Sequence, residues 1–188
     1  MNARFEEYWA AEFTETVPLP HSLHEQHPER WVRFHHLPES KRIPSDEDEI
    51  RTVLARHDIV MEHLFMPDNL VVVSGQFLTQ GDTTFPDEDL DALAGPFRYW
   101  QTLQDPGDEF EAPMSLFVGS CTYDGGREQI LAKTATWQLA NLFFCQPPTP
   151  VLYHPYDGGM DVIVEHAQFR DLLKETFRDW LSAHPEGL

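Results

Sequence analysis

The chain has 188 residues, of which 41% are hydrophobic and 12% aromatic, a composition that supports a sizeable core and excludes an intrinsically disordered protein. Its 32 acidic residues outnumber its 13 basic residues, and the formal net charge of −19 argues against nucleic acids and anionic membranes as partners, because both are polyanions. The same charge favours basic proteins or metal cations, although it also serves simply to keep a protein soluble.

Length and cysteine usage indicate one cytoplasmic domain over residues 1–188. A domain averages about 150 residues, and the sequence contains no internal repeat or low-complexity linker. Cys121 and Cys145 are too few for the disulfide framework of a secreted protein. No run approaches the roughly 20 apolar residues of a membrane helix, and the N-terminus lacks the apolar core of a signal peptide.

The N-terminal region predicts a short helix, a polar loop and a strand. An aromatic stripe at helical spacing, typical of a docking helix, comprises Phe5, Tyr8, Trp9 and Phe13. Three histidines then follow at intervals of three residues, at His21, His24 and His27, in a segment bounded by prolines. We expect a loop there and no metal site, because no acid or cysteine completes a metal signature. Residues 30–37 alternate as a strand.

The clearest helix begins after Pro44, with Ser45 as its expected cap and four acidic residues in its first turn. Its apolar face comprises Ile50, Val53, Leu54, Met61, Leu64 and Phe65. His57 lies on that stripe, so we expect a hydrogen-bonded core histidine rather than a ligand.

The remaining chain predicts mainly strands and a last helix. The expected strands are residues 70–77, 97–103, 114–123, 139–145, 151–154 and 160–164, with a turn at 105–108. A short helix is expected over 127–137, and an amphipathic one over 169–181 that ends at His184-Pro185. This order predicts an α+β fold, an antiparallel or mixed sheet with N-terminal, central and C-terminal helices packed on one face.

Basic residues are scarce, so the group Arg33, His35, Lys41 and Arg42 forms a local positive island. Such an island can hold a carboxylate or a phosphate, with arginine as the bidentate partner. The alternative is that it neutralises acidic residues elsewhere in the fold.

The segment 150–164 is the densest group of chemically capable side chains, with Tyr153, His154, Tyr156, Asp157 and Asp161. In a functional interpretation, either Tyr153 or Tyr156 converges with His154, Asp157, Asp161 and the positive island on a small polar ligand, and His154 acts as a general base or metal ligand. In a structural interpretation, the segment is a β-hairpin shaped by Pro155 and the glycines. The segment becomes a site only if the positive island lies against it.

Three segments, Trp31–Arg42 (with Leu-Pro-Glu-Ser-Lys-Arg), Leu152–Gly159 (Leu-Tyr-His-Pro-Tyr-Asp-Gly-Gly) and Asp179–Gly187, are similar to stretches shared by a group of uncharacterised bacterial proteins. Residues 156–163 also resemble the Tyr-Asp-Asp-Arg-Gly-Met-Asp-Val-Ile motif of a domain of unknown function, although Asp-Arg is absent and the loop is shorter. The resemblance implies a bacterial cytosolic protein and brings no activity with it.

Two functions remain open. The sequence contains no nucleotide-binding loop, nucleophile elbow or cysteine-pair zinc motif, and no cofactor is expected. We therefore favour a non-enzymatic, immunity-like binding protein whose acidic surface meets a basic protein partner. The alternative is a small metal-assisted or acid–base hydrolase that uses the turn from His154 to Asp161. The oligomeric state does not follow from the sequence.

Overall fold

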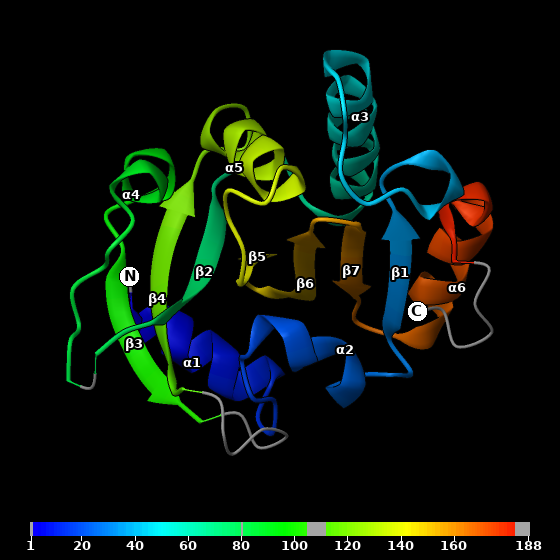
Figure 1. Ribbon diagram of the computed structural model, residues 1–188. Helices are drawn as coiled ribbons and strands as arrows, with labels where there is room; N and C mark the ends of the chain where they lie inside the picture. The colour runs from blue at the N-terminus through cyan, green and yellow to red at the C-terminus, as the bar shows by residue number, and fades with distance from the viewer. Residues whose placement is uncertain (1, 80, 105–111, 183–188) are drawn as a thin grey trace.

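The computed structural model describes residues 2–79, 81–104 and 112–182, and their strands form a seven-stranded antiparallel sheet (Figure 1). The strands are β1 (Trp31–His35), β2 (Leu70–Phe77), β3 (Arg98–Leu103), β4 (Met114–Cys121), β5 (Leu142–Gln146), β6 (Thr149–Tyr156) and β7 (Gly159–Ile163). Their spatial order is β1-β7-β6-β5-β2-β4-β3. The predicted α+β fold is confirmed, and the sheet is antiparallel rather than mixed.

The N-terminal segment covers one face of the sheet. It contains α1 (Asn2–Glu12), the 3-10 turn η1 (Pro20–Ser22) and the short α2 (Leu23–Gln26). The predicted aromatic stripe of α1 is buried against side chains of the central strands, such as Val73, Val118 and Phe143. Trp9 stacks at an angle on Phe143, with ring centroids 5.6 Å apart. The aromatic spacing therefore identified a docking helix correctly.

The other helices cover the opposite face. They are α3 (Glu47–Leu64), α4 (Glu88–Ala94), α5 (Gly126–Ala135) and α6 (Ala167–Thr176), with 3-10 turns at η2 (Pro38–Ser40) and η3 (Arg178–Trp180). In Figure 1, α3, α4 and α5 lie on the side of the sheet away from α1 and α2, and α6 lies beside β1. Both faces are thus buried, and the expectation of helices on one face was wrong. Alternating strand residues such as Val72 and Val73 belong to the two separate cores.

Several local predictions need correction. Asp46, not Ser45, caps α3, because its Oδ1 accepts the Glu49 amide at 2.9 Å. The segment after Pro20 is helical rather than a loop. Leu172 does not share the apolar face of α6, since its exposed fraction is 57%. The turn predicted at 105–108 and the helix end at His184-Pro185 lie outside the described residues.

Two further features of the fold bear on function. Among the described residues, none of the helices has the length and apolar character needed to cross a membrane.

Gly119 in β4 lets α4 approach the sheet, because a Cβ atom there would stand 2.2 Å from the Ala94 carbonyl oxygen. Packing therefore explains this glycine.

Replacing Trp9 with alanine tests the docking of α1. Trp9 is buried, and we expect Trp9→Ala to lower the free energy of unfolding by about 3–5 kcal/mol through the cavity it leaves. The matched control is Trp137→Ala, at a tryptophan that is 69% exposed, with an expected change of about 0.5 kcal/mol or less. Urea denaturation measures both. Equal losses in the two variants would show that α1 does not stabilise the sheet.

Candidate functional site

The pairing of β1 with β7 places the positive island against the C-terminal hairpin. Arg33 stands opposite Asp161 in the register, and its Nε and Nη2 donate to the two carboxylate oxygens at 2.7 and 2.8 Å. Trp31 Nε1 donates a third hydrogen bond to Asp161 at 2.9 Å. The side chain of Asp161 is 2% exposed, so this is a buried, bidentate ion pair.

The charge state of Asp161 follows from these contacts. Burial alone would raise the pKa of its carboxyl, but the hydrogen bonds from Arg33, together with the positive charge of Arg33 and the proximity of His154, hold that pKa well below its usual value. Asp161 is therefore ionised, and the N–H groups of Trp31 and Arg33 already occupy it. It cannot act as a base or a metal ligand without losing its arginine.

His154 and Tyr156 share the face of the sheet that carries this pair. His154 stands opposite Asp161, with Nδ1 3.9 Å from Oδ2, which is longer than a hydrogen bond. That nitrogen is buried and makes no hydrogen bond with a described residue. Arg33 lies over the ring of Tyr156 at 5.1 Å from its centroid, and burial raises the pKa of the Tyr156 hydroxyl.

At the tip of the hairpin, Asp157 binds Arg42 through both carboxylate oxygens, at 2.8 and 2.7 Å. The Asp157 side chain is 8% exposed and that of Arg42 is 66% exposed. The turn itself consists of Asp157 and Gly158, so Pro155 lies within β6 and not in the turn as expected. Gly159 lies against β1, where a Cβ atom would stand 2.0 Å from the Phe34 carbonyl oxygen.

The remaining candidate residues have other environments. His35 lies on the face of Arg33 and opposite Gly159, and burial lowers its pKa. Lys41 points to the helix cap instead, with Nζ 2.6 Å from the Glu49 carboxylate. Tyr153 belongs to the opposite core. The positive island and the hairpin are thus adjacent. Lys41 and Tyr153 take no part in this contact, because their side chains lie elsewhere.

Tyr153 belongs to a buried hydrogen-bonded chain that the sequence did not reveal. His36 Nε2 donates to the Arg42 carbonyl oxygen at 2.7 Å, which leaves its Nδ1 as acceptor for His57 Nε2 at 3.4 Å. His57 Nδ1 then accepts the Tyr153 hydroxyl at 2.5 Å. The prediction of a hydrogen-bonded core histidine at position 57 is confirmed. Its place on an apolar stripe was the available signal.

A pocket of about 200 Å³ lies beside the hairpin. It is lined by His21, Trp137, Leu139, Ala140, Asn141, His154, Pro155, Tyr156 and Asp157. Trp137 is 69% exposed and has a φ of 63°, in the left-handed region that bulky residues rarely adopt. Sequence reasoning missed this residue, because neither its exposure nor its backbone conformation leaves a pattern.

The cysteines and histidines offer little further chemistry. Burial raises the pKa of the Cys121 thiol to about 11 and that of Cys145 further, so neither is a thiolate near neutral pH. Residues 2–79, 81–104 and 112–182 contain no group of three histidine, cysteine or acidic side chains placed to hold a metal ion. His21, His24 and His27 accordingly do not converge on one.

The fold and the paired hairpin define an α+β domain with an antiparallel sheet enclosed by helices on both faces. A family model described as a domain of unknown function, DUF3885, matches residues 19–185, so the chain belongs to this family. Neither the curated proteins nor the solved structures contain a significant match. The resemblance to a domain of unknown function is therefore confirmed at the level of the family.

The buried ion pair makes a prediction about stability. We expect Arg33→Gln to lower the free energy of unfolding by about 3–5 kcal/mol, because it leaves the Asp161 carboxylate buried without its counter-charge. The pKa of Asp161 is lowered by folding, so its contribution is present above the unfolded value of about 3.9 and is lost as pH falls.

The control for this variant is Arg51→Gln, which breaks an exposed pair with Asp48 and should cost about 1 kcal/mol or less. Urea denaturation at neutral pH compares the two. A loss for Arg33→Gln no larger than that of the control would contradict a structural role for the buried pair.

The histidine chain predicts a dependence of stability on pH. Burial, the nearby His36 and Arg127 all lower the pKa of His57 well below 6.5, so unfolding at mildly acidic pH takes up a proton. The contribution of His57 to the free energy of unfolding is therefore fully present above the pKa of an unfolded histidine, about 6.5. Below that pH the free energy of unfolding falls by at most about 1.4 kcal/mol per pH unit for one histidine.

We expect His57→Gln to reduce this slope, with the remainder due to groups such as His36, whose pKa is also lowered by burial. The control is His63→Gln, the same substitution at an exposed histidine of the same helix. Urea denaturation from pH 7.5 down to about pH 5 gives the slopes. Identical slopes in all three proteins would rule out His57 as their source.

Proposed function

We infer that the protein is a non-enzymatic binding protein whose acidic surface engages a basic protein partner. The observation that carries this proposal is the net charge of −19, together with the ion pairs that most of the basic residues make within the chain. Ion pairs with carboxylates of the same chain engage Arg33, Lys41, Arg42, Arg51, Arg127, Lys133, Arg170 and Arg178. Few positive charges are left to balance the exposed acids.

One part of this surface supports the proposal in detail. Asp58 and Glu62 on α3 lie close to Glu128 in the first turn of α5 and to Asp124 in the turn before it, and we call these four residues the α3–α5 acidic patch. Burial raises the pKa of Asp58, Arg127 opposes the rise, and Glu128 and Glu62 add to it. Glu62 and Glu128 therefore repel the carboxylate of Asp58, whose ion-pair partner is Arg127.

Arg127, the cation beside this patch, is buried and is not accessible to a partner. Arg127 is 7% exposed, and it pairs with Asp58 at 2.9 Å and lies over the ring of Tyr123 at 4.1 Å. The hydroxyl of Tyr123 is buried beside the patch and makes no hydrogen bond with a described residue. A lysine or arginine from a partner would instead meet the exposed carboxylates of the patch, those of Glu62 and Glu128.

A basic toxin that is neutralised by an immunity-type factor is a partner of the required chemistry. Charge complementarity steers such partners together and speeds association more than it strengthens the final complex. The proposal needs no catalytic group, which agrees with the engagement of Asp161 and Asp157 by arginines. Bacterial origin and a cytoplasmic location remain part of the proposal.

The alternative function is acid–base hydrolysis at the hairpin. It is favoured by one observation: His154 lines the 200 Å³ pocket, and its buried Nδ1 makes no hydrogen bond with a described residue. It is ranked second because the carboxylate nearest to that nitrogen, Asp161, already accepts hydrogen bonds from Trp31 and Arg33. A general base of this kind would lack a free carboxylate to orient it.

The partner proposal is tested by affinity capture from the native host. We expect a basic protein to be recovered at low salt, and its association rate to fall steeply as salt is added. In a purified pair, Glu62→Lys with Glu128→Lys should slow association by about tenfold or more.

The matched control is Glu6→Lys with Glu7→Lys on α1, which makes the same change in net charge on the other side of the sheet. An equal effect of the two double variants would locate the attraction in the net charge and not in the α3–α5 acidic patch. Recovery of no basic protein at low salt would overturn the proposed function itself.

A further inference from the structure

Polar side chains lie side by side on the three neighbouring strands β2, β4 and β3. In the register, Ser115 on β4 stands opposite Gln76 on β2 and opposite Thr102 on β3. All three therefore share the face of Phe117, two residues along β4 from Ser115, which is part of the core beneath α3, α4 and α5. Ser115 is 4% exposed, so a buried hydroxyl replaces an apolar side chain at this end of the sheet.

A β-bulge adds a tyrosine to the same face. Tyr99 pairs with Phe117 and Gln101 pairs with Leu116, so Trp100 is the extra residue of β3. In a regular strand, Tyr99 and Thr102 would point to opposite faces, because they are an odd number of residues apart. The bulge brings both hydroxyls to one face and sends Trp100 to α1, where its ring contacts Trp9.

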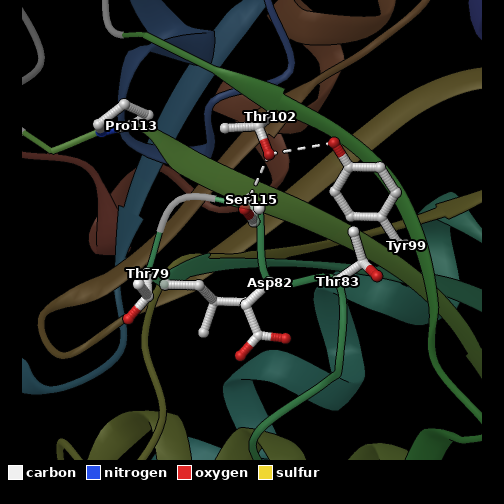
Figure 2. A pocket seen from close by; sticks show the side chains of 9 residues that line it. Thr79, Asp82, Thr83, Tyr99, Thr102, Pro113 and Ser115 are labelled. Atoms are coloured by element: carbon white, nitrogen blue, oxygen red, sulfur yellow. Dashed lines mark hydrogen bonds between the residues drawn. The ribbon is translucent and has the colours of Figure 1, made fainter.

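The three hydroxyls form a connected line, shown in Figure 2. Thr102 Oγ1 lies 2.9 Å from Ser115 Oγ and 3.1 Å from Tyr99 Oη. Their side chains come from two neighbouring strands and lie on one side of a pocket (Figure 2). Bulges are frequent beside functional sites because they re-aim side chains in this way.

The pocket has a volume of about 420 Å³, which lies in the range of small-molecule sites. Its other wall is the segment after β2, including Leu78, Thr79 and Asp82. Asp82 is exposed, and its Oδ1 accepts the Thr84 amide at 2.8 Å. Leu78 and the Tyr99 ring supply apolar surface.

The side chains that line the pocket indicate the kind of ligand it can bind. A carboxylate and the lone pairs of several hydroxyl oxygens make the wall rich in acceptors. None of the described residues that line the pocket is basic, so an anion would find no counter-charge. A ligand with several N–H donors and a positive charge satisfies these acceptors, and its carbon chain fits against Leu78 and Tyr99.

We propose that this pocket binds a small cationic amine, with its ammonium group on Asp82 and further donors on the Tyr99–Thr102–Ser115 hydroxyl line. The binding site is separate from the α3–α5 acidic patch, and it does not depend on the protein partner. The bulge at Trp100 is the structural device that assembles it.

The test is isothermal titration calorimetry with putrescine, ethanolamine and glucosamine, and with glucose and inorganic phosphate as comparison probes. We expect at least one amine to bind, and Asp82→Asn to weaken it about tenfold or more through loss of the charge. The amide oxygen introduced by this substitution can still accept from Thr84. Thr102→Val, at an exposed side chain, should weaken the same amine about threefold or more by interrupting the hydroxyl line.

The matched control is Asp68→Asn, an exposed aspartate that likewise accepts a backbone amide, that of Asn69 at 2.7 Å. It makes the same change in net charge away from the pocket and should leave the affinity unchanged. Equal weakening by Asp68→Asn and Asp82→Asn would mean attraction to the acidic surface alone and would overturn the proposal. So would binding of glucose or phosphate as tight as that of the amines, or no binding of any amine to the wild-type chain. Circular dichroism checks that each variant is folded, and an unfolded Asp82→Asn leaves the decision to Thr102→Val.

Discussion

The ion pair between Arg33 and Asp161 joins the first strand of the sheet to the last. The Asp161 carboxylate is 2% exposed, and because an isolated buried charge costs several kcal/mol, it depends on the bidentate hydrogen bonds and the opposite charge of Arg33. The pairing also sets the register of β1 on β7, since a slip by one residue would send Arg33 into the apolar core that contains Val32 and Phe34. Positive charge is scarce in this chain, and one of its few arginines is committed to this purpose.

That commitment decides what the positive island can do. Arg33 and Arg42 neutralise Asp161 and Asp157, which is the structural role weighed for the island, and Lys41 completes the cap of α3. The two carboxylates that made the hairpin a candidate site are therefore already bound by arginines of the same chain. What remains is the acidic surface, on which the proposed binding function rests.

Sequence reasoning succeeded where one short segment determines the outcome. The strand Leu70–Phe77 was predicted at its observed bounds, because β-branched residues suit both faces of a central strand. Tyr153 was wrongly grouped with His154 in one candidate site, although neighbouring residues of a strand alternate and Tyr153 belongs to the opposite core. What the sequence could not supply is contact between distant segments. Arg33 meets Asp161 only through the strand order, and the bulge at Trp100 has no signature in its own residues.

Three of the buried polar side chains show three different ways in which such a group is accommodated. Asp161 is neutralised by an arginine, and His57 stays neutral within a hydrogen-bonded chain. Ser115 differs from both, because its hydroxyl line ends at a pocket of about 420 Å³ that also contains a carboxylate. A polar group closed off inside the core contributes to specificity of the fold, whereas one that faces open volume remains available to a ligand. By this criterion the hydroxyl line, rather than the acid-rich hairpin, is the part of the sheet built to bind a small molecule.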